Sequence, residues 1–249
     1  MVEISELHPI LEASSSDSGN VSRILRPIEF EELIKQFIKR KVDYVGIPIA
    51  ILMTGMRYIE IQRLIDHPEW QIYNEKIIDP GGIRISNKKR TKGSPRARVI
   101  YLSDYGNDRI KNFLTTYVNR RLPNRDYFNE VLEKLAVEIG FPILPREVTM
   151  TAYILDENGN KVLNDEGAPT TVNYLKEFNT TAITEKSLRK TWVSWLMTIY
   201  PQFEARITES MGHSPTTSRR YYQTYRFSDY DIEMMEKYVK GFVPERLLK

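Results

Sequence analysis

A stripe of large apolar side chains at helical spacing runs through the segment that begins near Glu185. Its five members recur at i, i+4, i+7, i+8 and i+11, and they are Leu188, Trp192, Trp195, Leu196 and Ile199. This spacing places all five on one face of an α-helix, and such a face is stable only when other elements cover it. Because the chain contains no cysteine, no disulfide can substitute for that burial. We therefore expect a core held together by apolar packing alone.

Helical periodicity recurs along most of the chain, with short β-patterned interruptions. We expect further helices in the segment from Pro27 and over residues 45–53, 57–64, 108–118, 126–139, 203–211, 216–223 and 230–239. Two β-patterned segments, 83–86 and 97–102, flank a loop and predict a hairpin. The pair Asn158-Gly159, between β-type runs, is typical of a type I′ turn. The predicted fold class is therefore mainly α with a small antiparallel β-sheet (α+β).

The composition predicts one folded domain behind a short lead-in. A cluster of Ser, Asp, Gly and Asn at residues 14–20 indicates a flexible lead-in or linker remnant over residues 1–24, and we expect residues 25–249 to form one large domain. No apolar run approaches the roughly 18 residues that a membrane span requires, and the N-terminus lacks the pattern of a signal peptide. We expect a protein without a membrane segment, located in the cytoplasm.

The basic character of the chain is concentrated in the predicted hairpin. Residues 84–98 contain no acid and seven bases, namely Arg84, Lys88, Lys89, Arg90, Lys92, Arg96 and Arg98. A two-stranded ribbon with this charge can enter or span a groove of a nucleic acid and neutralise its phosphates. The alternative is a solvated edge hairpin whose lysines deter aggregation. By contrast, residues 147–185 hold seven acids and two bases, so we expect this segment to face away from DNA.

Three separated sequence boxes suggest a site for a phosphate. The first is TGMRYIEIQRL, in which Arg57 follows a glycine break and begins a helix, so that main-chain N–H groups and a guanidinium could converge on one anion. The second is KSLRKTWVSWL, in which Lys186 and Arg189 share a helix face. The third is MGHSPTTSRRYYQTY, in which Tyr222 lies nine residues after His213. Each box taken alone is ordinary.

In this order, the boxes resemble those of the tyrosine recombinase (phage-type integrase) family, over the chain from about Arg26 to its end. The resemblance identifies residues 25–249 as a recombinase catalytic domain. The family pattern T-G-hydrophobic-R-x-x-E-hydrophobic is matched at residues 54–61, H/K-x-L-R-H/K-T at residues 186–191, and G-H with a following tyrosine at residues 212–222. The family also carries a hairpin lysine between the first two boxes, and Lys92 in Arg90-Thr91-Lys92 resembles it.

The resemblance implies a catalytic role for six residues. Two arginines, Arg57 and Arg189, would neutralise the non-bridging oxygens of a scissile phosphate, with Lys186 and His213 as further hydrogen-bond donors. The phenol of Tyr222 would attack the phosphorus and form a covalent 3′-phosphotyrosine. The ammonium of Lys92 would protonate the leaving 5′-oxygen. The family chemistry uses no metal, ATP or other cofactor.

Several alternatives stay open within this interpretation. Lys88 or Lys89 could replace Lys92 as the proton donor, and Tyr221 or Tyr225 could replace Tyr222. The carboxylate of Glu60, one turn after Arg57, either orients an arginine or lies exposed on its helix. The activity could also be that of a type IB topoisomerase, although the compact spacing from His213 to Tyr222 favours a recombinase. A DNA-binding protein with an inactive site is the third alternative.

The resemblance also implies the partners. We expect double-stranded DNA as substrate, a homotetramer acting on two duplexes, and a monomer without DNA. An integrase of a mobile element or virus would work in the cytoplasm of its host cell. Family members usually place a helical core-binding domain before the catalytic domain, and only about 25 residues precede it in this sequence. The chain is then either an excised catalytic domain, which we favour, or a naturally minimal protein. The motifs HExxH, GxxxxGK[ST] and GxGxxG do not occur, which removes the main support for a zinc protease, a P-loop nucleotidase or a dinucleotide enzyme.

Overall fold

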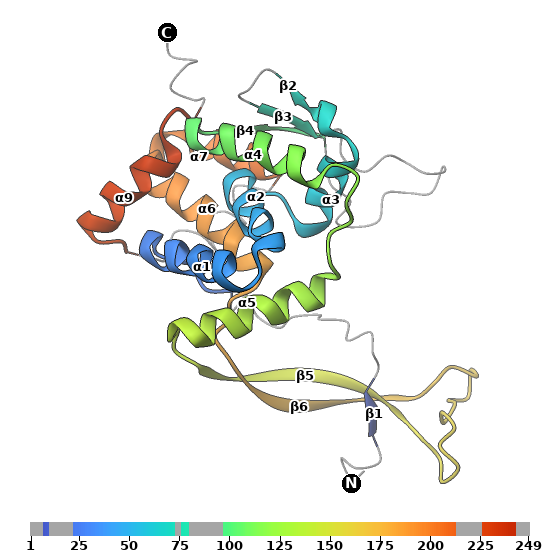
Figure 1. The fold of residues 1–249 in the computed structure, drawn as a ribbon. Helices are drawn as coiled ribbons and strands as arrows, with labels where there is room; N and C mark the ends of the chain where they lie inside the picture. Colours follow the sequence, from blue (N-terminus) through green and yellow to red (C-terminus); the bar gives the residue numbers. More distant parts are fainter. Residues whose placement is uncertain (1–6, 10–21, 73–75, 80–96, 213–225, 243–249) are drawn as a thin grey trace. The chain divides into compact units, whose positions relative to one another are not determined.

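The computed structural model describes residues 7–9, 22–72, 76–79, 97–212 and 226–242. Its fold is mainly helical with two small antiparallel sheets, as the sequence predicts (Figure 1). The backbone divides into two compact units, one of Met1–Val21 with Pro142–Thr181 and a larger one of Ser22–Phe141 with Ala182–Lys249. The expected lead-in over residues 1–24 stays a prediction, because most of it lies outside the described residues.

The described part of the larger unit is built from helices around two central ones. These are α1 (Pro27–Arg40), α2 (Gly46–Thr54), α3 (Tyr58–Asp66), α4 (Asp104–Tyr117), α5 (Arg125–Ile139), α6 (Glu185–Ile199), α7 (Glu204–Met211) and α9 (Asp229–Val239). Short 3₁₀ turns lie at Val42–Tyr44, Pro68–Trp70 and Pro201–Phe203. Helix α2 packs against α4 and α6, and α6 packs in turn against α7 and α9. The helix expected over 216–223 lies outside the described residues.

The central helices are buried on nearly every side. In α6, Leu188, Trp192, Trp195 and Leu196 have no exposed surface, as the predicted stripe requires, and Val193 and Met197, on the far side of the helix, are buried as well. Helix α2 carries the apolar run of residues 45–53 and is likewise buried along its length. Burial on all sides is the pattern of a core helix. The two helices therefore form the framework against which the other elements are placed.

The chain entering the larger unit is held by the second sequence box. The hydroxyl of Thr191 accepts the N–H of Leu25 at 2.9 Å, and the indole of Trp195 donates to the carbonyl of Leu25 at 3.0 Å. The ammonium of Lys190 donates to the carbonyl of Ser22 at 3.1 Å, and burial lowers the pKa of Lys190. Two of the residues that match the family pattern thus act on the fold, by fixing the start of the domain.

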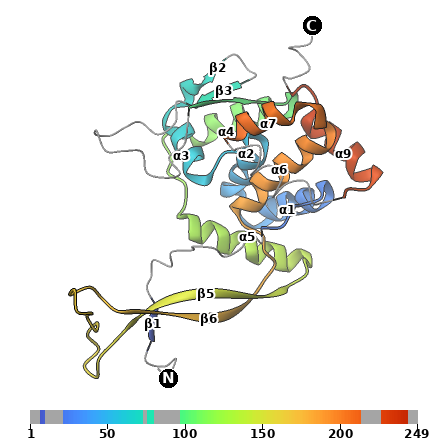
Figure 2. The same cartoon turned by 180° about the vertical axis from the view of Figure 1, so that it is seen from behind.

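Helix α9 packs on its own chain. Met235, Tyr238 and Val239 are buried, and α9 lies beside α1 and α6 in both views (Figures 1 and 2). Asp231 accepts the guanidinium of Arg26 at 3.0 Å, and the phenol of Tyr238 donates to Glu31 at 2.6 Å. Burial, reinforced by the Glu31 carboxylate, raises the pKa of Tyr238. Residues 229–239 therefore complete the core of this unit.

The sheet of the larger unit has the order β2–β3–β4 and is antiparallel throughout. Its strands are β2 (Gln71–Ile72), β3 (Lys76–Asp79) and β4 (Arg98–Tyr101). In the register of β3 and β4, Ile77 is opposite Ile100 and Asp79 is opposite Arg98. Strand β4 confirms the β pattern expected at 97–102, whereas the strand expected at 83–86 lies outside the described residues.

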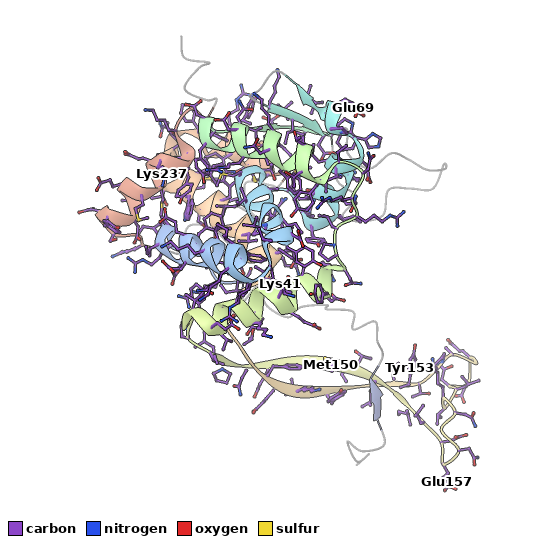
Figure 3. The ribbon with its side chains drawn as sticks, viewed as in Figure 1. Lys41, Glu69, Met150, Tyr153, Glu157 and Lys237 are labelled. Carbon is purple, nitrogen blue, oxygen red and sulfur yellow. The ribbon has the colours of Figure 1, made fainter. Side chains whose placement is uncertain are left out.

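The smaller unit is a long antiparallel hairpin with a third short strand. Strand β5 (Leu144–Ile154) pairs with β6 (Thr171–Thr180), and β1 (Leu7–Pro9) pairs with the other edge of β5. Figure 3 shows Met150 and Tyr153 along this hairpin and Glu157 at its tip. The ammonium of Lys161 lies 3.8 Å from the ring centroid of Tyr153, a cation–π contact that joins the tip to β5.

The turn at Asn158-Gly159 is not of type I′, because Asn158 does not adopt the positive φ that this turn requires. Instead, Gly159 alone is left-handed, with φ of +79°, and its N–H donates to the carbonyl of Asp156. The N–H of Asp156 in turn donates to Asn160. This is a three-residue loop closed by a glycine bulge. The same pattern of bonds recurs between Asn164 and Ala168, so the hairpin ends in two tandem turns.

Among the described residues, no single helix has both the length and the hydropathy to cross a membrane. Only the bent pair Val42–Thr54 and Tyr58–Asp66, with 105° between its parts, meets both criteria when the two are taken together. The first part of that pair contains α2.

Two left-handed glycines that end helices allow a test of the packing. Gly55 ends α2 with φ of +60°, and a Cβ there would overlap the sulfur of Met211. Gly140 ends α5 with φ of +88° and has no atom within 4 Å of the same position. We expect Gly140→Ala to cost about 1 to 2 kcal/mol of unfolding free energy through backbone strain alone, and Gly55→Ala to cost about 1 to 3 kcal/mol more through overpacking. Urea unfolding measures both, and equal losses would contradict the packing described.

Candidate functional site

The first sequence box folds into a tight connection between two helices. The hydroxyl of Thr54 donates to the carbonyl of Ala50 at 2.6 Å and accepts the N–H of Met56 at 3.1 Å. Gly55 takes the left-handed conformation that ends α2, as is usual for glycine at this position. Arg57 is then the N-cap residue of α3. The box therefore turns the chain within three residues and places Arg57 at a helix start.

The carboxylate of Glu60 caps the start of α3. It accepts the main-chain N–H of Arg57 at 2.7 Å and the guanidinium of Arg57 at 2.8 Å. The sequence suggested that this N–H could bind a phosphate. That expectation is wrong for the N–H of Arg57, because the carboxylate of Glu60 already accepts it. The side chain of Glu60 is fully buried, so the alternative of an exposed helix carboxylate is wrong as well.

The guanidinium of Arg189 joins the ends of two helices. One nitrogen donates to the carbonyl of Gly55, at the end of α2, at 2.5 Å. The other donates to the carbonyl of Met211, the last residue of α7, at 2.6 Å. The first nitrogen also lies 3.7 Å from Glu60. The structure therefore brings Arg57 and Arg189, which the sequence places in different boxes, to the same carboxylate.

A third guanidinium reaches the same point, and sequence reasoning assigned it to the basic hairpin. Arg98 donates to Glu60 at 2.5 Å and to the carbonyl of Met211 at 2.6 Å. Its side chain is 3% exposed, so its charge is not part of a surface for DNA. A signal for this was present in the sequence: along β4, Arg98 shares a face with Ile100, and both residues are buried.

The pKa of Glu60 results from two opposing effects. Burial disfavours the charged carboxylate and would raise the pKa. The guanidinium groups of Arg98, Arg189 and Arg57, together with the N–H of Arg57, favour the charged form more strongly, and the pKa of Glu60 lies below its ordinary value. Glu60 is therefore ionised at neutral pH. We call Arg57, Arg98 and Arg189 the arginine cluster.

The arginine cluster carries more positive charge than its carboxylate balances. Three guanidinium groups meet the buried carboxylate of Glu60. A second buried carboxylate, that of Asp79, lies 3.3 Å from Arg63 and 3.4 Å from Arg98, so four arginines face two carboxylates. The side chain of Arg57 is 44% exposed, so solvent reaches the cluster on that side. An excess of guanidinium charge with an open side is suited to a phosphate, which accepts two parallel hydrogen bonds from one arginine.

The other residues singled out by sequence are placed only in part. Lys186 is exposed in the first turn of α6, one turn before Arg189. Gly212, which precedes His213, ends α7 with φ of +65°, and a Cβ there would lie 3.3 Å from a guanidinium nitrogen of Arg98. The remaining candidates lie outside the described residues, and they are Lys88, Lys89, Lys92, His213, Tyr221, Tyr222 and Tyr225.

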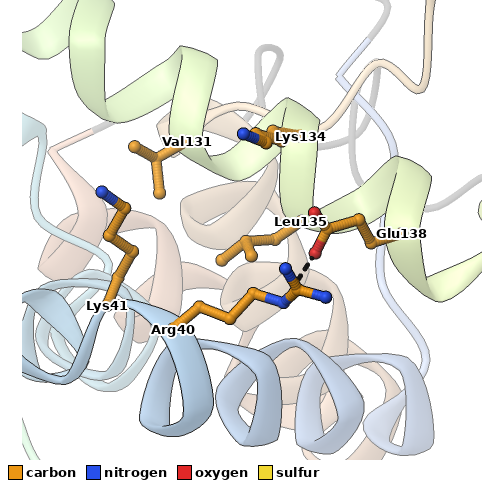
Figure 4. A pocket seen from close by; sticks show the side chains of 6 residues that line it. All are labelled: Arg40, Lys41, Val131, Lys134, Leu135 and Glu138. Atoms are coloured by element: carbon orange, nitrogen blue, oxygen red, sulfur yellow. Dashed lines mark ion pairs between the residues drawn. The ribbon is translucent and has the colours of Figure 1, made fainter.

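A pocket of about 360 Å³ lies between the end of α1 and α5, apart from the arginine cluster (Figure 4). Arg40, Lys41 and Lys134 contribute its cationic side chains, and Arg40 pairs with Glu138 at 3.0 Å. In the part of the chain that the structure describes, no group of three or more His, Asp or Glu side chains is arranged to hold a metal ion.

Comparison with known proteins gives matches in structure alone, since no family model and no curated protein matches the chain. The Tn1549 transposon integrase, solved in complex with transposon right end DNA, matches with a TM-score of 0.51 at 14% identity, over 94% of this chain and 69% of the integrase. XerA recombinase matches with 0.48 at 13% identity, over 86% of this chain and 64% of XerA. XerH site-specific recombinase, bound to a palindromic difH substrate, matches with 0.44 at 14% identity, over 90% and 55%.

The buried charge of Glu60 predicts a specific pH dependence of stability. Glu60→Gln should lower the unfolding free energy at pH 7 by about 3 kcal/mol, because it leaves buried arginines without their carboxylate. Since the folded-state pKa of Glu60 is depressed, this difference from the wild type should be present above the ordinary carboxyl range and decline as the pH falls through the folded-state pKa. Urea unfolding between pH 3 and 7 measures it.

The matched control is Glu29→Gln. Glu29 accepts the N–H of Arg26 at 2.8 Å in a capping box of the same form at the start of α1, and it pairs with Arg23, which is partly exposed, at 2.5 Å. It contacts neither Arg98 nor Arg189 and is itself partly exposed. We expect a smaller loss of unfolding free energy for this variant. Equal losses for the two variants at every pH would mean that Glu60 acts as a helix cap alone.

Proposed function

We propose that this chain, which has the fold of a tyrosine recombinase catalytic domain, cuts and rejoins DNA strands as a site-specific recombinase or integrase. The observation that supports this most directly is the meeting of Arg57 and Arg189 at the buried carboxylate of Glu60. A phosphodiester is a poor electrophile because its negative charge repels nucleophiles. A pair of guanidinium groups held in place before the substrate arrives is the arrangement that such a reaction requires.

The two arginines differ in their proposed tasks. Arg57, on the exposed side of the cluster, would bind a non-bridging oxygen of the phosphate as it arrives from solvent. Arg189, buried and fixed by two carbonyl groups, would present a rigid donor to the charge that develops in the pentacoordinate transition state. Lys186, exposed one turn before Arg189 on α6, and His213 would supply further donors.

Covalent chemistry would pass through Tyr222. In this proposal the phenol of Tyr222 gives up its proton to solvent and its oxygen attacks the phosphorus. The bond to the 5′-oxygen breaks, and Lys92 protonates that oxygen to give a 5′-hydroxyl. A 5′-hydroxyl of a partner strand then attacks the phosphotyrosine and restores a phosphodiester. The ester bond to tyrosine retains the energy of the original linkage, so rejoining needs no ATP.

The proposed substrate is double-stranded DNA, with a homotetramer on two duplexes as the working assembly. The Tn1549 transposon integrase, with which the chain shares its fold, was solved with transposon right end DNA. The chain spans about two thirds of the length of that integrase and of XerA. We expect weak DNA binding by this domain alone, with a strong dependence on salt.

A nicked suicide duplex tests the nucleophile. The wild type should form a covalent protein–DNA adduct that survives a denaturing gel, because the short strand beyond the cut diffuses away and prevents rejoining. Tyr222→Phe should form none, and Tyr221→Phe and Tyr225→Phe serve as matched controls that keep the adduct. An adduct that persists in Tyr222→Phe and is lost in one of the controls would transfer the nucleophile to that tyrosine.

Arg57→Ala tests the phosphate site with little effect on the fold, because Arg98 and Arg189 still balance Glu60. We expect the cleavage rate to fall about 100- to 1000-fold, the usual cost of one transition-state donor. Bulk DNA affinity should change little, since one phosphate contact among many is lost. Arg206→Ala, which removes an exposed arginine paired with Glu209 on α7, is the control. Parallel losses of binding and cleavage in Arg57→Ala would make Arg57 a DNA anchor.

A further inference from the structure

Arg98 is the member of the arginine cluster that none of the three boxes contains. It lies on β4 and donates to Glu60, on α3, and to the carbonyl of Met211, at the end of α7, and its Nε lies 3.4 Å from Asp79 on β3. With 3% of its side chain exposed, it has no open side at which to meet a substrate. Its contacts are with the groups that surround the proposed phosphate site, and they indicate an effect exerted through those groups.

The first contact controls the charge of Glu60. A fully buried carboxylate needs nearby cations to stay ionised, and Arg98 is the nearest, at 2.5 Å, compared with 2.8 Å for Arg57 and 3.7 Å for Arg189. Without Arg98, the carboxylate would draw Arg57 and Arg189 toward itself. Both would then be less available to a phosphate, because their guanidinium groups would pair with Glu60 instead.

The second contact fixes the main chain before His213. Arg98 shares the carbonyl of Met211 with Arg189, each at 2.6 Å. A guanidinium nitrogen of Arg98 also lies 3.3 Å from the position that a Cβ of residue 212 would occupy. Because Gly212 has no Cβ, the side chain of Arg98 can pack closely against it. Arg98 thereby anchors the end of α7 from which the chain continues into the third box.

We propose that Arg98 is a positioning residue of the phosphate site: by neutralising Glu60 and holding the carbonyl of Met211, it keeps Arg57 and Arg189 directed toward a phosphate. This inference rests on the proposed function, since it assigns the arginine that prepares the same site. Arg98 contacts neither the phosphate nor the nucleophile in this scheme. It therefore affects the rate of cleavage through Glu60 and the carbonyl of Met211.

A double-mutant cycle tests the inference. The variants Arg98→Met, Glu60→Gln and the double variant are assayed for adduct formation on the suicide duplex under single-turnover conditions at saturating protein. We expect Arg98→Met to slow cleavage about 100-fold, as displaced catalytic groups do, with little change in DNA affinity. The double variant should cleave about tenfold faster than Arg98→Met, because the unbalanced carboxylate is gone, so that the two effects are not additive.

Arg63→Met is the matched control. Arg63 pairs with Asp79 at 3.3 Å, as Arg98 does at 3.4 Å, but Arg63 has no hydrogen bond or ion pair to Glu60 or Met211 among the described contacts. We expect it to lose stability and keep its cleavage rate. Arg98→Lys retains the charge but has one nitrogen for two acceptors, and it should cleave at a rate between those of the wild type and Arg98→Met. If Arg98→Met does not fold, the cleavage rate of Arg98→Lys tests the inference instead.

The outcomes separate this inference from the proposed function. A wild type that forms no adduct refutes the proposed function and the inference with it. A wild type that cleaves, with a folded Arg98→Met or Arg98→Lys variant that cleaves at the same rate, refutes the inference alone. A double variant no faster than Arg98→Met also refutes it, because Arg98 would then not act through the charge of Glu60.

Discussion

The buried carboxylate of Glu60 is the interaction on which the rest of the site depends. Ionised and withdrawn from water, it is stable only while guanidinium groups surround it. Those groups come from the start of α3, from β4 and from α6. The negative charge of Glu60 therefore holds the start of α3, strand β4 and helix α6 in fixed positions relative to one another. The geometry of the cluster follows from the packing of these elements in the core.

The carboxyl ends of two helices also stabilise the arginine cluster, through Arg189. Gly55 ends α2, Met211 ends α7, and Arg189 donates to the carbonyl groups of both. The carboxyl end of a helix carries partial negative charge, which favours a cation there. Arg189 is thus stabilised by two helices before any substrate is bound. Such preorganisation is what a site must have if it is to stabilise a transition state without rearranging.

The sequence predicted what depends on local periodicity and missed what depends on distant pairing. The buried helices α2 and α6 follow from apolar runs and stripes. Strand β1 could not be predicted, because β5, the strand with which it pairs, is more than a hundred residues away in the chain. The boxes singled out Arg57 and Arg189, which the structure brings to one carboxylate. Arg98 was missed because it stands in a run of basic residues, and only its alternation with Ile100 marks it as buried.

The burial of the cluster has a consequence for ionic strength. Mobile salt ions weaken attractions between charges that face water and have far less effect on charges enclosed by protein. Glu60 and Arg98 belong to the second kind. In the proposed reaction, added salt should therefore weaken the binding of DNA to the protein surface well before it disturbs the arginine cluster. The affinity for DNA would then depend on ionic strength far more than the rate of cleavage of bound DNA does.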